Sequence, residues 1–261
     1  MTDYSAIKPP AQPGLAFLDP GNGRKIAMRI RDPAPGQPTV LFLPGYASDM
    51  EGAKAVAIDA FCAARGAGCV RLDYSGTGSS AGAFADATLH GWRDDAIHVA
   101  DLAVPRGPLV IAGSSMGAWL ALHVAMARPA RVKGLLGIAA APDFTDWGYS
   151  DEDKAALKAA GKLERPNPYG PEPSVTHFPL WQSGAGMRML TQPIDLSIAV
   201  RLIHGTADTE VPAWVPQRIM DQLHSSDVQL RLIKGAGHRL SEPHEIHAIL
   251  VELHGLLELA R

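Results

Sequence analysis

The stretch Gly113-Ser114-Ser115-Met116-Gly117 decides the fold of this chain. It has the pattern G-x-S-x-G, follows the apolar residues 109–112 and opens the apolar helical pattern of residues 118–122. A strand, a sharp turn with a serine and then a helix are the setting in which this pattern holds a nucleophile at a sheet edge. The flanking glycines fit such a turn because a Cβ would crowd the backbone there. The motif therefore predicts Ser115 as a nucleophile.

A serine hydroxyl needs a base to remove its proton, and at this kind of turn the partners follow in the order serine, acid, histidine. Asp208 lies in a loop after the predicted strand at residues 200–204, and His238 lies in a Gly-rich loop after the predicted strand at residues 228–233. Open parallel α/β sheets place their reactive groups beyond the carboxyl ends of the strands. We therefore expect Ser115, Asp208 and His238 to meet there as a catalytic triad.

Two other carboxylates compete with Asp208 for the role of the acid. Asp143 also follows an apolar run, residues 135–141, and Glu210 is a weaker alternative in the same loop as Asp208. The turn before Asp208 and the Val211-Pro212 that follows it favour Asp208. The H-E-x-H sequence at residues 244–247 lacks the H-E-x-x-H spacing of zinc sites, so we expect no metal site there.

A second turn predicts the oxyanion hole. The apolar residues 40–43 end at Pro44-Gly45-Tyr46, where such enzymes supply a backbone N–H from the loop after a central strand. We expect the N–H groups of Tyr46 and Met116 to hold the oxyanion. The Gly-rich run at residues 71–80 lacks the phosphate-loop lysine, so it predicts a strand-to-loop crossing in which Asp73 bonds nearby backbone.

The rest of the chain alternates strands and helices over a single domain, residues 1–261. Such alternation predicts an α/β-hydrolase type of fold, a mostly parallel sheet with helices on both faces, entered through a hairpin at residues 15–31. Further strands are expected at residues 39–43, 69–74, 109–112, 132–139, 200–204 and 228–233. Helices are expected at residues 52–65, 89–102, 116–127, 213–223 and 242–259.

The alternation breaks between residues 142 and 196. A helix at residues 151–160, capped by Ser150, is followed by a Pro-rich stretch and by apolar clusters. A long insertion with apolar content is typically functional, so we interpret it as a lid over Ser115, with a docked structural excursion as the alternative. The predicted pocket residues are Trp119, Trp147, Phe178, Trp181 and Met187.

Composition limits the partners. The 261 residues carry a net charge of −3 and no basic stripe, which argues against nucleic acid as a partner. No run of about 18 apolar residues predicts a membrane span. Residues 1–13 are polar and Pro-rich without the features of a signal peptide, so a cytoplasmic location is expected. The two cysteines, Cys62 and Cys69, are expected as buried free thiols.

The chain resembles the α/β-hydrolase superfamily, and more closely its abhydrolase-domain subgroup, which contains a mitochondrial palmitoyl-protein thioesterase and acyl-glucuronide esterase. The resemblance covers roughly residues 38–140 and 198–260. It rests chiefly on Leu43-Pro44-Gly45-Tyr46, Arg71-Leu72-Asp73-Tyr74-Ser75-Gly76, Gly113–Leu120 and Arg201-Leu202-Ile203-His204-Gly205. It implies the same triad and a serine esterase or thioesterase, with protein S-deacylation or acyl-glucuronide cleavage as candidate activities.

The predicted chemistry is acyl transfer to Ser115 followed by hydrolysis, with no metal or organic cofactor. The expected substrate is a small-molecule or acylated-protein ester or thioester. Three alternatives stay open. These are an acyltransferase or perhydrolase on the same triad, a peptidase, and a non-catalytic ligand-binding protein of this fold.

Overall fold

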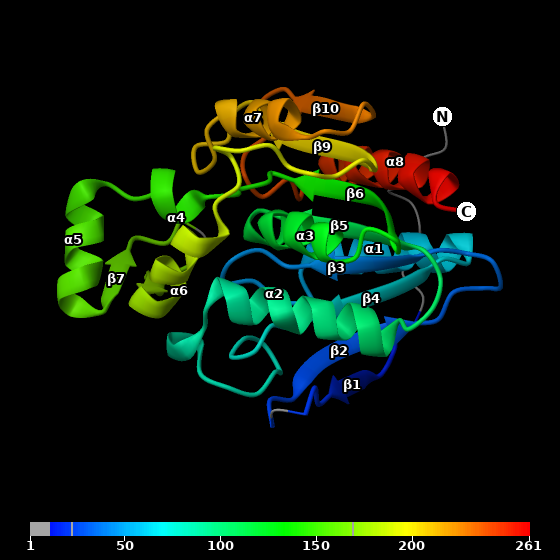
Figure 1. The fold of residues 1–261 in the computed structure, drawn as a ribbon, viewed down its shortest axis with the longest axis horizontal. Helices are drawn as coiled ribbons and strands as arrows, with labels where there is room; N and C mark the ends of the chain where they lie inside the picture. The colour runs from blue at the N-terminus through cyan, green and yellow to red at the C-terminus, as the bar shows by residue number, and fades with distance from the viewer. Residues whose placement is uncertain (1–10, 22, 169) are drawn as a thin grey trace.

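The sheet that positions the site is mostly parallel. The computed structural model describes residues 11–21, 23–168 and 170–261, and in these ranges one sheet of eight strands runs in the order β1-β2-β4-β3-β5-β6-β9-β10 (Figure 1). β1 and β2 are antiparallel to their neighbours, and all other pairs are parallel. The strands are β1 (Leu15–Leu18), β2 (Ile26–Arg31), β3 (Thr39–Leu43), β4 (Gly68–Leu72), β5 (Leu109–Ser114), β6 (Val132–Ile138), β9 (Ala199–Gly205) and β10 (Val228–Ile233).

Helices cover both faces of this sheet. One face carries α2, α3 and α7, and the other carries α1 and α8, which contact each other behind the central strands (Figure 1). The helices are α1 (Ala53–Arg65), α2 (Leu89–His98), α3 (Met116–Ala127), α7 (Trp214–Gln222) and α8 (Pro243–Leu259).

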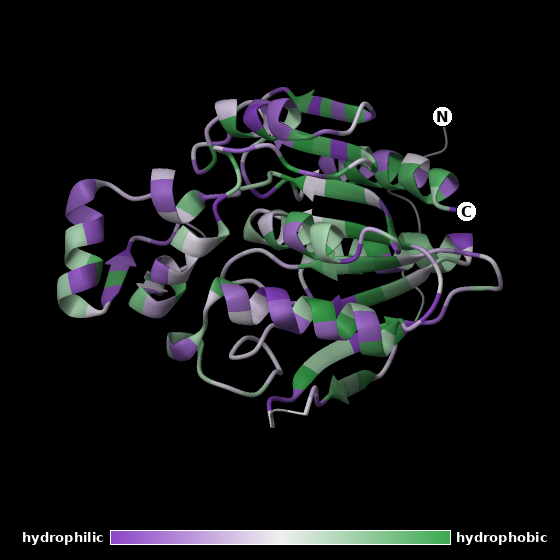
Figure 2. Cartoon of the chain, viewed as in Figure 1, coloured by the Kyte–Doolittle hydropathy of each residue, from purple (hydrophilic) through white to green (hydrophobic). Residues whose placement is uncertain are grey.

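Alternate residues of the central strands build two separate cores. On β5, Leu109 and Ile111 join the core under α2 and α3, while Val110 and Ala112 join the core under α1 and α8. A strand buried on both faces must be apolar at every position, because successive side chains point to opposite faces. Figure 2 shows these central strands as largely hydrophobic.

Most predicted elements are confirmed, and their boundaries differ by a residue or two. The largest difference is in the helix expected at residues 89–102, where α2 ends at His98 and a π-helical turn, η3 (Val99–Ala103), follows. Cys62 and Cys69 are buried free thiols, as expected. Residues 1–10 of the polar, Pro-rich N-terminal stretch lie outside the described residues.

Residues 142–196, here called the inserted segment, leave the sheet after β6 and return at β9. They lie beyond one end of the sheet, at the left of Figure 1. The segment holds α4 (Phe144–Trp147), α5 (Asp151–Ala160), the antiparallel pair β7 (Lys162–Arg165) and β8 (Ser174–His177), α6 (Phe178–Ser183) and the short η4 (Gly184–Met187). The predicted cap of α5 is present as a capping box, in which the Ser150 hydroxyl accepts from the Asp153 N–H and the Asp153 carboxylate accepts from the Ser150 N–H.

Candidate active site

Ser115 occupies a strained turn between β5 and α3. Its backbone angles are φ 55° and ψ −120°, a conformation that side chains other than glycine seldom adopt. The turn is held by its own main chain, since the Ser115 N–H donates to the Ile138 carbonyl at 2.8 Å and its carbonyl accepts from the Ala141 N–H at 3.2 Å. Strain that is held in place by surrounding bonds is typical of a functional position.

The two motif glycines are required by close backbone packing. A Cβ built on Gly113 would lie 2.4 Å from the Gly117 carbonyl oxygen. A Cβ built on Gly117 would lie 2.1 Å from the Leu43 oxygen and 2.4 Å from the Pro44 oxygen. The first turn of α3 therefore presses directly against the end of β3, which brings the serine turn beside the loop that follows β3.

Gly117→Ala is expected to destabilise the fold by about 3 kcal/mol or more, because backbone atoms of β3 cannot move aside as a flexible side chain could. Gly255→Ala is the matched control: it lies in α8 and a Cβ there meets nothing within 4 Å. That change should be neutral or stabilise by about 0.5–1 kcal/mol. Urea unfolding of both variants measures the difference, and equal stabilities would contradict the packing argument.

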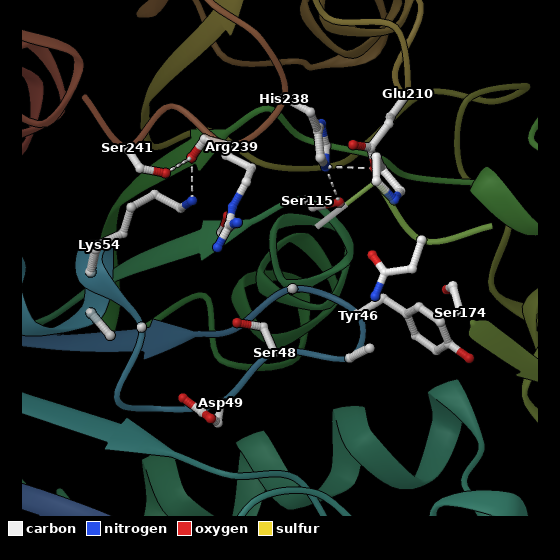
Figure 3. A pocket seen from close by; sticks show the side chains of 18 of the residues that line it. Tyr46, Ser48, Asp49, Lys54, Ser115, Ser174, Glu210, His238, Arg239 and Ser241 are labelled. Carbon is white, nitrogen blue, oxygen red and sulfur yellow. Dashed lines mark hydrogen bonds and ion pairs between the residues drawn. The ribbon is translucent and has the colours of Figure 1, made fainter. Parts of the chain in front are cut away.

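An imidazole links the serine to an acid. His238, in the loop after β10, has Nε2 3.0 Å from the Ser115 Oγ and Nδ1 2.9 Å from Oδ2 of Asp208, which lies in the loop after β9. The Asp208 side chain is fully buried and the His238 side chain is 14% exposed. All three residues lie just beyond the carboxyl ends of parallel strands, and Figure 3 shows Ser115 and His238 facing each other.

The environment of Asp208 keeps it ionised. Burial acts to raise the pKa of this carboxyl, but the hydrogen bond and charge of His238 and the N–H groups of Val211 and Glu210 outweigh it and lower the pKa. Those two N–H groups donate to Oδ1 at 2.9 Å each. A carboxylate facing Nδ1 fixes the tautomer with the proton on that nitrogen, so Nε2 can accept the Ser115 proton.

His204, near the end of β9, contacts the loop that carries Asp208. Its Nε2 lies 3.1 Å from the Val211 carbonyl oxygen and 3.7 Å from Oδ2 of Asp208. Burial lowers the pKa of this histidine. The neutral imidazole therefore serves as a hydrogen-bond donor that holds the loop.

The competing carboxylates lie elsewhere. Asp143 accepts hydrogen bonds from the N–H groups of Met189 and Leu190 at 2.9 to 3.1 Å, so it anchors the returning end of the inserted segment. Glu210 lies at the rim with Oε2 3.9 Å from His238 Nε2, on the side of the imidazole that faces the serine. Asp208 is thus the carboxylate that faces Nδ1.

The loop after β3 lies against the serine turn. A Cβ built on Gly45 would be 3.4 Å from the Cβ of Ser115, and Tyr46 and Met116 both line a cavity that also contains Ser115. Within the described ranges, no acceptor takes a hydrogen bond from the N–H of Tyr46 or of Met116. The prediction that these two N–H groups form the oxyanion hole stays a prediction.

Two cavities meet at Ser115, and both have mixed polar and apolar walls. The smaller, about 400 Å³ and here called the aromatic cavity, is lined by Phe144, Trp147 and Tyr149 together with the charged Arg165 and Glu210. The larger, about 580 Å³ and here called the charged cavity, is lined by Arg165 and Glu210 as well, and it also includes Asp49, Lys54 and Arg239, which Figure 3 labels.

Lys54, in the charged cavity, is shielded from water and bonded to the loop that carries His238. Burial, together with the nearby charge of Arg239, lowers the pKa of the Lys54 ammonium to about 8. Its Nζ donates to the carbonyl of Arg239, the residue that follows His238. This bond fastens the histidine loop to α1.

The predicted pocket residues are corrected in four of five cases. Trp147 lines the aromatic cavity, but neither cavity at Ser115 is lined by the other four. Trp119 is fully buried and donates through Nε1 to the carbonyl of Met187, which is buried as well. Phe178 and Trp181 pack on each other, and the Trp181 indole donates to the Thr145 carbonyl. These side chains fasten the inserted segment to the body and to itself.

Phe144 and Tyr149, which line the same cavity as Trp147, were not predicted from the sequence. A signal was present, because three aromatic residues fall within the six positions 144–149, shortly after the end of β6. An aromatic cluster at the carboxyl edge of a parallel sheet, next to the serine turn, indicates a ligand pocket.

The fold and the site together define the class of protein, a serine hydrolase with the α/β-hydrolase fold. A family model described as serine aminopeptidase, S33, matches residues 34–168. The mitochondrial palmitoyl-protein thioesterase ABHD10 of Rattus norvegicus is 34% identical, over 98% of this chain and 83% of its own length.

Two solved structures agree. A putative hydrolase from Agrobacterium vitis S4 superposes with a TM-score of 0.87 at 34% identity, covering 96% of this chain and 100% of that chain. Mouse α/β hydrolase domain-containing protein 10 superposes with a TM-score of 0.86 at 33% identity, covering 94% and 98%. The chain belongs to the serine aminopeptidase S33 family of α/β hydrolases, in the group that contains the ABHD10 proteins. The predicted fold and the predicted enzyme class, an ester or thioester hydrolase, agree with this membership.

The predicted location is wrong. A cytoplasmic location was expected from the N-terminal residues, but the curated relatives from five mammals are all named as mitochondrial proteins. Composition at one end of a chain is a weak indicator of location, since transit signals are read by receptors rather than set by the fold. In the described ranges, none of the helices is both long enough and apolar enough to cross a membrane.

Proposed function

We propose that this protein cleaves carboxylic esters or thioesters through an acyl-enzyme on Ser115, with S-acylated proteins as the first candidate substrates. The observation that carries the proposal is the continuous hydrogen-bonded chain from Ser115 Oγ through His238 to Asp208. The names of the curated relatives, palmitoyl-protein thioesterases, support the thioester as the bond cleaved.

In the first step, His238 Nε2 removes the Ser115 proton as Oγ attacks the acyl carbon. The carboxylate of Asp208 keeps the imidazole oriented and stabilises its positive charge. The carbonyl oxygen becomes an oxyanion and accepts hydrogen bonds from the N–H groups of Tyr46 and Met116. A single such donor is worth about 3–4 kcal/mol in well-studied serine hydrolases. His238 then protonates the leaving thiol or alcohol, and water hydrolyses the acyl-enzyme by the same steps.

In this proposal each cavity binds a different part of the substrate. The aromatic cavity binds the acyl chain, because Phe144, Trp147 and Tyr149 offer a hydrocarbon an alternative to water. The charged cavity binds the leaving group. The inserted segment supplies walls to both cavities through Trp147 and Arg165, so it serves as a lid that selects the substrate.

A series of thioesters and oxoesters with acyl chains from two to sixteen carbons tests this division. Trp147→Ala should lower kcat/KM about tenfold for the long chains and much less for acetyl, because only a long chain reaches the aromatic wall. Lys158→Ala is the matched control in the inserted segment, since Lys158 lines neither cavity. An equal loss on all chain lengths would contradict the assignment of the aromatic cavity to the acyl chain.

The same assay separates the remaining activities. Added alcohols or peroxide would divert the acyl group if the enzyme is a transferase or perhydrolase. A panel of aminoacyl amides examines the peptidase activity that the family description names. Turnover confined to these substrates would overturn the ester and thioester proposal.

A further inference from the structure

The loop between β3 and α1 is anchored near both ends by hydrogen bonds to three residues of one other segment, Arg71, Asp73 and Tyr74. Near its end, the Met50 N–H donates to the Asp73 carboxylate at 2.8 Å and the Met50 carbonyl accepts from Arg71 Nη1 at 2.6 Å. At its start, the Pro44 carbonyl accepts from the Tyr74 hydroxyl at 3.1 Å. Arg71, Asp73 and Tyr74 are each at most 2% exposed, so these bonds form away from water.

The anchoring residues Asp73 and Tyr74 are themselves held by hydrogen bonds and close packing. The second oxygen of Asp73 accepts from the Ser79 N–H at 2.8 Å, and a Cβ built on Gly78 would lie 2.1 Å from that oxygen. The Tyr74 ring stacks on Trp92 with ring centroids 5.2 Å apart. Trp92 Nε1 in turn donates to the Ser75 carbonyl at 2.9 Å. The hydroxyl and the carboxylate are thus held before any substrate arrives.

The stretch between the two anchored residues, Pro44 and Met50, is short and contains the proposed oxyanion donor. It runs over residues 45–49 and contains Tyr46 and the strained Ala47, at φ 53°. The Tyr46 hydroxyl donates to the Val175 carbonyl of the inserted segment at 2.5 Å, which fixes the side chain of the same residue. Any shift of Pro44 or Met50 would move the Tyr46 N–H, because few residues lie between them.

We propose that Asp73 and Tyr74 are positioning residues that hold the backbone N–H of Tyr46 at the oxyanion. The inference rests on the proposed function, since it needs an oxyanion to form beside Ser115. It also assigns a role to residues of a distinctive run outside the catalytic triad, Arg71-Leu72-Asp73-Tyr74-Ser75-Gly76. A side chain that places a transition-state donor acts on turnover rather than on substrate binding.

The test is Tyr74→Phe, which removes only the hydroxyl and leaves the ring stacked on Trp92. We expect kcat on an oxoester to fall about tenfold with KM nearly unchanged, a fraction of the loss that follows complete removal of an oxyanion donor. The diagnostic substrate is the matching thionoester, which places a sulfur, a poor hydrogen-bond acceptor, where the oxyanion oxygen would be. Its slower hydrolysis should be almost unaffected, so the oxoester-to-thionoester rate ratio should fall about tenfold.

Ser183→Ala is the matched control. It also removes a partly buried hydroxyl that donates to a backbone carbonyl, that of Leu180 at 2.7 Å, and Ser183 lines neither cavity, so the rate ratio should stay unchanged. Asp73→Asn weakens the second anchor, the bond to the Met50 N–H, and should also lower the oxoester-to-thionoester rate ratio. An equal fall on both substrates in Tyr74→Phe, or no fall on either, would overturn the proposal. Failure of the proposed function is recognised separately, by full activity in Ser115→Ala.

Discussion

Ser115→Ala should reduce kcat on a p-nitrophenyl ester by at least about 10⁴-fold, the largest loss expected of any single change. The hydroxyl is the only proposed nucleophile, and its removal leaves His238 with no proton to take. The fold should persist, because the serine turn is held by backbone bonds to Ile138 and Ala141 rather than by the side chain. The absorbance of released p-nitrophenolate measures the loss of turnover, and thermal unfolding measures the stability of the fold.

Ser225→Ala serves as the control for this prediction. Ser225 donates to the Ile198 carbonyl, lines neither cavity at Ser115 and is expected to leave turnover intact. A Ser115→Ala protein that is folded and keeps a tenth or more of the activity would place the nucleophile elsewhere.

Asp208→Asn should have the second largest effect and lower kcat about 10⁴-fold. An amide facing Nδ1 presents an N–H where a carboxylate stood, so the imidazole adopts the tautomer that cannot accept the Ser115 proton. The change should also abolish the burst of p-nitrophenol that marks acyl-enzyme formation. Stopped-flow measurement with a p-nitrophenyl ester tests both.

Asp143→Asn is the matched change at the competing acid. Asp143 contacts the backbone at Met189 and Leu190, so the variant should lose stability of the inserted segment while it keeps most of its turnover. The assignment of the acid is contradicted if Asp143→Asn is inactive and Asp208→Asn is active.

The core of the fold could be predicted because its determinants are local. Alternating strands and helices, and glycines at places where a Cβ would touch backbone, leave a clear pattern in the sequence. The end of α2 was less predictable. Residues 99–103 keep a helical pattern of apolar side chains, but the backbone loosens into a π-helical turn, which no propensity separates from an α-helix.

The inserted segment was the harder part for a physical reason. Aromatic side chains in and beside this segment either line a cavity or pack it onto the rest of the protein. Which they do depends on hydrogen bonds between residues far apart in the chain, such as the bond from Trp119 in α3 to the Met187 carbonyl. Two tryptophans predicted for the pocket, Trp119 and Trp181, instead use their indole N–H groups to fasten the segment. Composition alone does not distinguish these uses.

The support of the loop after β3 was visible in the sequence only as a distinctive run without a role. Asp73 was expected to bond nearby backbone, and this is confirmed by its bonds to Met50 and Ser79. The partner in the loop lies more than twenty positions away along the chain, so only the folded structure brings the two segments together.

The most direct measurement is the site of covalent labelling by a fluorophosphonate, located by tandem mass spectrometry of the digested protein. The account predicts one adduct per chain, on the hydroxyl of Ser115, with loss of hydrolytic activity in proportion to labelling. An active protein that remains unlabelled at Ser115, or whose activity is lost through an adduct on another residue, would contradict it.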